Sequence, residues 1–291
     1  MKGIIVAGGL GSRLYPITEI FSKHLLPVYD KPMIYYPISV LMLTDIKDIL
    51  IITTKKDINL YENLLGDGSR FGINLSYKIQ DNPRGIPEAL ILGEEHINGE
   101  NVCMILGDNI FYGHDFSSAL QKGQNLKDGA LIFGYQVKDP SRFGVANIDT
   151  NGKVTGLVEK PKNPESNIAV TGLYFYDNKC VEMSKSLKPS DRGELEITDL
   201  NKMYLKDGNL ECTILGRGFS WLDTGTHESL LLASQFVQIL EDRTGTKIAC
   251  LEEIALNNRW ISVAQVRDNI KDFSSGNYYN YIKELINNEN W

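Results

Sequence analysis

The chain has 291 residues, of which 42% are hydrophobic and 23% are charged, and its formal net charge is −7 at pH 7. This balance is typical of a globular protein with a substantial core, so it excludes disorder as the default state. The negative charge argues against nucleic acid as the main partner, because such an interface needs clustered Lys and Arg. Anionic ligands would need local cations that overcome this overall field.

The N-terminal residues and the longest apolar segment indicate the cellular location of the protein. Residues 2–7 run directly into a glycine-rich turn, so we expect no signal peptide. The apolar segment 33–43 is too short to span a membrane and holds Pro37, so we expect a cytoplasmic protein with no membrane contact. The cysteines are far apart and form no CxxC pair, so we interpret them as buried core residues. They are Cys103, Cys180, Cys212 and Cys250.

Short β-branched runs alternate with helical patterns over the first half of the chain. This alternation is typical of βαβ units and predicts an α/β fold with a Rossmann-like, mostly parallel sheet flanked by helices. The predicted strands cover residues 2–7, 48–53, 74–79, 102–106 and 130–137. The predicted helices cover residues 33–43, 58–65, 87–96 and 116–122.

The pattern changes after residue 137. Residues 144–149 and 153–159 flank Asn151-Gly152, which is a hairpin signal, and residues 169–176 form another strand pattern. We therefore expect an antiparallel insertion at about 138–225, inside a core of residues 1–240. The later predicted elements are a helix at 194–205, a strand at 210–215, a helix at 226–240 and a helical C-terminal segment at 241–291.

Three glycines follow the first predicted strand and would let backbone N–H groups approach a phosphate closely. The dinucleotide pattern GxGxxG fails, because Leu14 stands where its third glycine should be. The P-loop pattern fails as well, because Arg13 stands where a glycine should precede Lys. Arg13 offers instead a planar, charged fork for phosphate oxygens. On this segment alone, a plain strand-to-helix turn with a surface arginine stays open.

Two aspartates are candidate metal ligands. Asp108 follows the apolar strand 102–106 at a Gly-Asp turn, and the carboxyl end of a central parallel strand is where ligands of such sheets bind. Magnesium accepts one or two carboxylates together with waters and phosphates. Asp223 lies in WLDTGT, a pattern that also fits an ordinary turn or the N-terminal region of a helix.

The segment GGLGSRL at 8–14 and the segment KHLLP at 23–27 resemble the signature of the sugar nucleotidyltransferases. The run KHLLPVYDKPMIYYP is similar to the thymidylyltransferase branch of that family. Four later segments resemble the same branch in the same order: LGDNIFYGHDF, VEKPKNPESNIAVTGLYFYD, RGELEITDLNKMYL and GRGFSWLDTGTHESLL. The chain departs at His24, where glutamine is common in the family, and at Phe143, where tyrosine is common.

The resemblance implies a magnesium-dependent enzyme that transfers a thymidylyl group from dTTP to glucose 1-phosphate by in-line attack, giving dTDP-glucose and pyrophosphate. It implies a role at the start of dTDP-rhamnose or related deoxysugar synthesis. The alternatives are a uridylyltransferase or another sugar-1-phosphate nucleotidyltransferase, and a non-catalytic nucleotide-sugar sensor on the same fold.

The resemblance also implies roles for individual residues. The triphosphate would be held by Arg13 and Lys23, the sugar phosphate by Lys160 and Arg192, and Mg²⁺ by Asp108 and Asp223. Substrate contacts are implied for Gly8, Gly11, Gln80, Pro83, Gly85, Asp108, Gly144, Glu159, Val170 and Tyr174. A homotetramer and a second site for a feedback nucleotide sugar such as dTDP-rhamnose are implied as well. That site would use Gly113, His114, Gly216, Arg217, Glu253 and Ile254.

Overall fold

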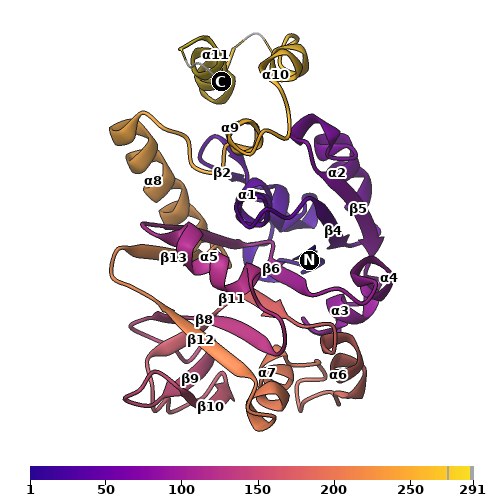
Figure 1. Ribbon diagram of the computed structural model, residues 1–291, viewed down its shortest axis with the longest axis vertical. Coiled ribbons are helices and arrows are strands. Elements are labelled where there is room, and N and C mark those ends of the chain that lie inside the picture. The colour runs from indigo at the N-terminus through magenta and orange to yellow at the C-terminus, as the bar shows by residue number, and fades with distance from the viewer. Residues whose placement is uncertain (274, 289–291) are drawn as a thin grey trace.

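The computed structural model describes residues 1–273 and 275–288. Its centre is a nine-stranded sheet with helices packed against it (Figure 1). Four neighbouring strands form the parallel half in the order β6, β1, β4, β5, and each has the bounds predicted from the sequence. They are β1 (Lys2–Ala7), β4 (Asp48–Thr53), β5 (Asn74–Ile79) and β6 (Val102–Leu106).

The parallel strands bury side chains on both faces. Successive residues of a strand point to opposite faces, and Ile4 and Ile5 of β1 lie in two different core clusters, each fully buried. The predicted helix at 87–96 is divided at Gly93, where a Cβ would lie 2.6 Å from Cδ1 of Ile4. The helices of this half are α1 (Tyr35–Leu43), α2 (Ile58–Leu65), α3 (Glu88–Leu92), α4 (Glu94–Ile97) and α5 (Phe116–Gln124).

The insertion continues the same sheet. Strand β11 pairs antiparallel with β6 and with β8, and β12 pairs parallel with β8. The Asn-Gly hairpin is formed by β9 and β10 and lies at one edge of the sheet. The elements are β8 (Ala130–Gln136), β9 (Gly144–Ile148), β10 (Val154–Glu159), β11 (Ile168–Tyr176), α6 (Cys180–Ser186), α7 (Ile197–Lys206) and β12 (Leu210–Leu215).

Two small antiparallel pairs lie outside this sheet, and the sequence patterns predict neither. One joins β7 (Asn109–Gly113) to β13 (Phe219–Asp223) and places Asp223 opposite Asn109. The other is the hairpin of β2 (Pro27–Val28) and β3 (Lys31–Pro32). In each case the strands are short, so their hydrophobic patterns are weak local signals. The β7–β13 pair carries the end of the WLD segment and therefore positions one of the candidate metal ligands.

The C-terminal part is helical, as predicted. Helix α8 begins after Thr226, whose side chain forms a capping box with Ser229. Figure 1 shows α10 and α11 at the end of the molecule away from the insertion strands. No helix in the described ranges combines the length and apolarity needed to cross a membrane. The helices are α8 (His227–Thr244), α9 (Leu251–Asn257), α10 (Val263–Asn269) and α11 (Asn277–Asn288).

The proposed division at residue 240 stays a prediction, and α8 runs across it to Thr244. Residues of α9 and α11 belong to the same core cluster as β1 and α1, so the C-terminal helices share the core of the first half. Three of the cysteines are buried in the core, and the fourth is partly buried, which agrees with their interpretation as packing residues. The buried ones are Cys103, Cys180 and Cys250.

Candidate active site

A cavity of about 450 Å³ opens where β6 ends and the insertion begins. It brings together side chains from the glycine-rich loop, both small strands β7 and β13, the hairpin strand β10 and helix α7. Eight residues predicted from the sequence line it: Arg13, Asp108, Gly144, Glu159, Lys160, Val170, Tyr174 and Asp223. The other lining residues are Ile86, Leu106, Asn109, Arg142, Phe143, Gly172, Ile197, Thr198 and Trp221.

The glycine-rich loop lies beside this cavity. Gly8 is buried, and a side chain at this position would collide with the amide of Gln80. Gly11 has φ of 63°, a conformation that favours glycine, and a Cβ there would lie 3.2 Å from Cβ of Lys23. The loop and Lys23 are therefore neighbours, as predicted from their spacing.

The residues implied in nucleoside binding follow β5. Gln80 is buried, and its amide donates a hydrogen bond of 2.6 Å to Glu88. Pro83 is exposed. Gly85 has φ of 113° and forms an isolated β-bridge with Leu195, where any side chain would collide with the Leu195 backbone. Gln80 thus lies against Gly8, whereas Gly85 ties this loop to the segment before α7.

Lys23 and Asp108 form the most buried ion pair of the site. The Lys23 ammonium donates to Oδ2 of Asp108, and Nδ2 of Asn109 donates to Oδ1 at 2.8 Å. Burial acts to raise the pKa of Asp108, but the charges of Lys23 and protonated His24 and the hydrogen bonds from Lys23 and Asn109 together outweigh burial and hold that pKa at about 2. Burial lowers the pKa of His24 to about 4, and the Lys23 charge adds to the effect. At neutral pH the site therefore has an ionised Asp108 beside a neutral imidazole.

Asp223 faces the same cavity from the end of β13 rather than from a turn or a helix. Its Oδ2 lies 3.5 Å from Nη2 of Arg142. A Cβ at Gly225 would lie 2.9 Å from Nη2 of Arg13 and 3.1 Å from Oδ2 of Asp223, so Arg13 and Asp223 approach the same glycine. Two hard carboxylate oxygens at one cavity are the donors that magnesium prefers, so Asp108 and Asp223 fit this ion.

The opposite side of the cavity is organised by Glu159. Its carboxylate accepts a hydrogen bond of 2.5 Å from the Thr198 hydroxyl and lies 3.5 Å from the Lys160 ammonium. Lys160 has φ of 41°, an uncommon conformation for a residue with a side chain. A Cβ at Gly144 would lie 2.8 Å from the Thr198 hydroxyl, so only glycine leaves this wall open. Burial raises the pKa of Tyr174, so the phenol is neutral.

Arg192 lies at the edge of this group and does not line the cavity. Its guanidinium contacts Glu194 at 3.0 Å and Glu196 at 2.9 Å, and it lies 3.8 Å from Glu159. Its side chain is 41% exposed. A phosphate at this edge would therefore have to compete with two carboxylates for the same guanidinium.

Sequence reasoning missed three polar residues of the site: Asn109, Arg142 and Thr198. Asn109 could have been noticed because it directly follows the Gly-Asp turn. Arg142 and Thr198 have no local signal, because Arg142 belongs to a connecting loop and Thr198 to an ordinary amphipathic helix. Both reach the cavity only through the fold.

The residues predicted for a second site are brought together only in part. His114 and Gly216 line a hollow of about 320 Å³, and Gly216 and Arg217 line an adjoining one of about 730 Å³. Gly113 ends β7 and pairs with Phe219. The remaining two predicted residues, Glu253 and Ile254, lie on α9 and line neither hollow.

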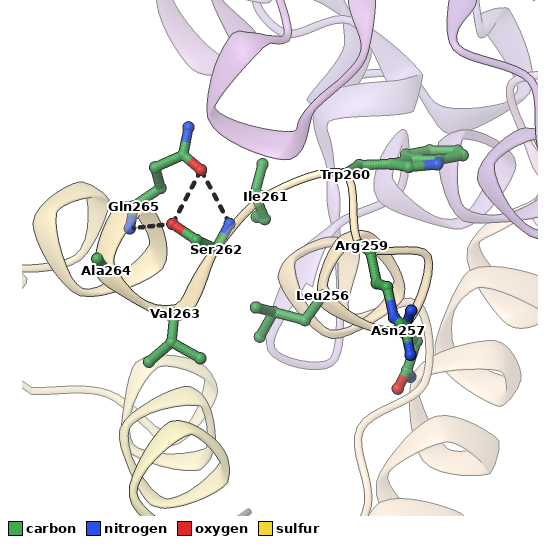
Figure 2. Close-up of a pocket in the computed structure, with 9 residues that line it drawn as sticks. All are labelled: Leu256, Asn257, Arg259, Trp260, Ile261, Ser262, Val263, Ala264 and Gln265. Atoms are coloured by element: carbon green, nitrogen blue, oxygen red, sulfur yellow. Dashed lines mark hydrogen bonds between the residues drawn. The ribbon is translucent and has the colours of Figure 1, made fainter. Parts of the chain in front are cut away.

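A further open hollow of about 930 Å³ lies between α9 and α10 (Figure 2). None of the predicted site residues lines it. Figure 2 shows Ser262 and Gln265 hydrogen-bonded to each other, in the capping box that begins α10. Their polar atoms serve the helix end, so we place the chemistry in the cavity at Asp108 and not here.

A sequence model of the family described as nucleotidyl transferase matches residues 2–239. The chain therefore belongs to the nucleotidyl transferase family, and the protein is an enzyme of the nucleotidyltransferase class.

Its similarity to glucose-1-phosphate thymidylyltransferases, predicted from the sequence, is confirmed by relatives that bear this name. The one from Neisseria meningitidis serogroup A is 56% identical over 98% of this chain and 99% of its own length. The one from Xanthomonas campestris pv. campestris strain B100 is 51% identical over 98% of this chain and 96% of its own length.

Two solved structures confirm the α/β fold. A Bacillus anthracis protein assigned as a glucose-1-phosphate thymidylyltransferase and solved with sucrose has a TM-score of 0.76 and 48% identity, covering 81% of this chain and 94% of its own. A UDP-glucose pyrophosphorylase solved with UDP-glucose has a TM-score of 0.73 and 26% identity, covering 82% of this chain and 98% of its own.

Proposed function

We propose that the protein transfers a thymidylyl group from dTTP to glucose 1-phosphate, giving dTDP-glucose and pyrophosphate. The observation that carries the proposal is the single cavity that Asp108, Asp223 and Arg13 line together with Glu159 and Lys160. One side offers carboxylates and a cation for a metal-bound triphosphate, and the other offers a carboxylate and a cation for a sugar phosphate. The identity of 56% with the Neisseria meningitidis enzyme supports the same reaction.

The expected reaction needs no general base. A phosphate monoester has a second pKa of about 6, so glucose 1-phosphate is largely a dianion at pH 7. One of its oxygens forms a bond to the α-phosphorus of dTTP, and the bond from that phosphorus to the bridging oxygen breaks in line, so pyrophosphate leaves. The attacking oxygen is already deprotonated, and no side chain has to accept a proton.

The main obstacle is repulsion between two polyanions. Like charges about 4 Å apart repel by about 4 kcal/mol per pair at an effective dielectric of about 20. We propose that Arg13 and Lys23 neutralise the triphosphate and that Lys160 and Arg192 neutralise the sugar phosphate. Positioning and electrostatic stabilisation are then the main catalytic effects.

The remaining contacts follow the same division. Gly8 and Gly11 would let backbone N–H groups reach the phosphates, and Gln80, Pro83 and Gly85 would contact the nucleoside. Glu159 would accept sugar hydroxyls, beside the walls formed by Gly144, Val170 and Tyr174.

Asp108 and Asp223 are the residues that would hold magnesium. A bound magnesium ion supplies positive charge that neutralises phosphate oxygens and orients them. The chain's own task at this position is to present both carboxylates to the cavity, and the lowered pKa of Asp108 keeps that carboxylate ionised at neutral pH.

A uridylyltransferase is the second candidate, because the fold also matches a UDP-glucose pyrophosphorylase. Pyrophosphate release with glucose 1-phosphate and magnesium should be measured with dTTP and with UTP in parallel. We expect kcat/KM to be higher for dTTP. A higher value for UTP would support the second candidate, and no release with either nucleotide would support a non-catalytic nucleotide-sugar sensor.

We also propose regulation by a nucleotide sugar at a second site in a cytoplasmic homotetramer, which fits a role in dTDP-rhamnose or related deoxysugar synthesis. Arg217 and His114 lie in adjoining hollows away from the cavity, and both side chains are exposed. Glu253 and Ile254 lie on α9 and line neither hollow, so we propose that a neighbouring subunit brings them to this surface.

Arg217→Ala tests the regulatory site. It should weaken inhibition by dTDP-rhamnose by about 5- to 150-fold while the KM for dTTP changes little, because coupling between two sites has this usual size. Inhibition kinetics against dTTP provide the measurement. Purely competitive inhibition that the substitution leaves unchanged would argue against a second site.

A further inference from the structure

Asn109 connects the two sides of the cavity through one buried amide. The residue is 3% exposed. Its Nδ2 donates to Oδ1 of Asp108 at 2.8 Å, on the side proposed for metal and triphosphate. Its Oδ1 accepts from the backbone N–H of Gly172 at 3.0 Å and from the indole N–H of Trp221 at 2.6 Å. Gly172 and Trp221 both line the cavity, so three strands meet at this side chain.

The surrounding backbone leaves room for this amide. The register between β11 and β8 shifts between Val170 and Tyr174, and Gly172 lies within that irregularity. A Cβ at Gly172 would lie 2.6 Å from Oδ1 of Asn109, so a larger residue would displace the amide. The N–H of Gly172 is thus directed to a side chain instead of a neighbouring strand.

The two donors fix which way the amide faces. An amide oxygen accepts hydrogen bonds and an amide nitrogen donates them, so turning the group over would place its NH₂ against the N–H groups of Gly172 and Trp221. Nδ2 must therefore face Asp108. With the Lys23 ammonium on Oδ2 and Asn109 on Oδ1, both carboxylate oxygens of Asp108 have a donor.

We propose that Asn109 is a positioning residue that orients the Asp108 carboxylate for magnesium and dTTP and couples this orientation to the Trp221 wall of the sugar pocket. The inference rests on the proposed function, because it assigns Asp108 to the metal. Residues that orient metal ligands usually change metal affinity or activity by about 10- to 100-fold when they are replaced. Trp221 is two residues before Asp223 on β13. Its hydrogen bond to Asn109 therefore also stabilises the strand that carries the second candidate ligand.

Asn109→Asp is the sharpest test. It keeps an oxygen for Gly172 and Trp221 but replaces the donor toward Asp108 with a carboxylate oxygen. Binding of dTTP in the presence of magnesium, without sugar phosphate, should be measured by isothermal titration. We expect the Kd to rise about 10- to 100-fold, with a smaller change in the KM for glucose 1-phosphate. The matched control is Asn201→Asp, a buried asparagine that accepts from Tyr176 and does not line the cavity.

A double-mutant cycle tests the coupling, and its Trp221→Phe single variant remains informative if Asn109→Asp folds poorly. Trp221→Phe removes one donor to Asn109 while keeping an aromatic wall, and we expect it to weaken magnesium-dependent dTTP binding by several-fold in the wild-type background. In the Asn109→Asp background, Trp221→Phe should weaken dTTP binding less, because the amide that connects Trp221 to Asp108 is absent.

The two outcomes that would overturn the proposal are dTTP binding within about twofold of wild type in folded Asn109→Asp, and strictly additive effects in the cycle. Failure of the proposed function would look different. A wild-type protein that binds dTTP with magnesium but makes no dTDP-glucose would refute the reaction, whereas the binding comparison between Asn109 variants would still decide the positioning role.

Discussion

Two groups of partly or fully buried charges in this protein are built differently. The first lies between hairpin β2–β3 and the end of α8, and none of its residues lines the cavity. The Lys31 ammonium contacts Asp30 at 2.5 Å and Glu241 at 2.9 Å, and the Lys247 ammonium contacts the same two carboxylates at 2.5 and 2.6 Å. Two cations and two anions thus satisfy one another.

The cavity holds the second group. There Lys23 pairs with Asp108, but the other cations have longer contacts: Arg142 lies 3.5 Å from Asp223, and Lys160 lies 3.5 Å from Glu159. The side chains of Arg142 and Lys160 are 47% and 44% exposed.

The comparison separates structural charges from charges available to a ligand. A buried ion pair offsets its desolvation cost only with good geometry and full hydrogen bonding, which the group at Glu241 has. It ties α8 to the hairpin that follows Lys23 and has no remaining need for an anion. Arg142 and Lys160, with exposed side chains and loose contacts, can exchange a carboxylate for a phosphate. The predictions below test this difference, from the largest expected effect to the smallest.

Glu241→Gln should lower the free energy of unfolding by about 3 to 5 kcal/mol, because it leaves two buried lysines without one of their partners. Turnover per folded molecule should stay close to wild type. Urea unfolding followed by circular dichroism provides the measurement. Glu182→Gln is the control, since it removes an exposed pair with Lys185 and should cost less than about 1 kcal/mol. Equal losses for both variants would contradict the assignment of a structural network.

Asp223→Asn should lower turnover and leave stability nearly unchanged, which is the reverse of the expectation for Glu241→Gln. Turnover should fall by about 100-fold or more, because a metal-binding charge at the reacting phosphates is lost, while the melting temperature stays nearly unchanged. Steady-state rates over a magnesium titration provide the measurement, and Asp199→Asn, outside the cavity, is the control. Magnesium-dependent turnover close to wild type would sink the assignment of Asp223 to the metal.

Lys160→Met should raise the KM for glucose 1-phosphate and lower turnover, because a charge-assisted contact worth about 1.5 to 3 kcal/mol is removed. Binding of dTTP should change little. Titration calorimetry with each substrate separately can decide, and the exposed neighbour Lys162→Met is the matched control. A loss of dTTP affinity at least as large as the loss for sugar phosphate would refute the division of the cations between the substrates.

Low pH should weaken the ion pair between Lys23 and Asp108 in the candidate site. The pKa of Asp108 is lowered from 3.8 to about 2, so its ionisation stabilises the folded state above pH about 4 and this contribution disappears as the pH falls through about 2. At about 1.4 kcal/mol per pKa unit, this shift corresponds to roughly 2.5 kcal/mol. Unfolding free energies of wild type and Asp108→Asn should therefore converge over this pH range. A difference that is independent of pH down to about 2 would show that the charge of Asp108 does not contribute.

Much of the sheet could be predicted from the sequence. The strands 2–7, 48–53, 74–79 and 102–106 have the predicted bounds. Three of them contain an apolar run with polar or glycine residues beside it, and 74–79 alternates polar and apolar residues. The predicted helix at 194–205 begins later, at Ile197, because the segment before it forms a bridge with Gly85 and turns stabilised by Ser190. That correction comes from long-range contacts and not from helix propensity.

The site was predictable in its chemistry but not in its assembly. The candidate site residues were predicted from the glycine-rich loop, the Gly-Asp turn and the resemblance to a family. Eight of these residues line one cavity. The individual roles stay predictions. Asn109 was missed although it directly follows the Gly-Asp turn, whereas Arg142 and Thr198 were missed because nothing in their neighbourhoods distinguishes them from ordinary polar residues.

By itself, the sequence determined the strands of the central sheet, most of the helices, the phosphate-compatible loop and the family, since these depend on residue type and on periods of a few residues. Only the tertiary structure decided that β7 pairs with β13. This pairing brings Asp223 opposite Asn109, which is 114 residues earlier in the sequence. It also decided that Lys31 contacts Glu241, 210 residues away, while Arg142 and Lys160 stay loosely paired in the cavity. The physical reason is that a contact between distant segments depends on the packing of the whole core. The sequence around one partner contains no pattern that identifies the other.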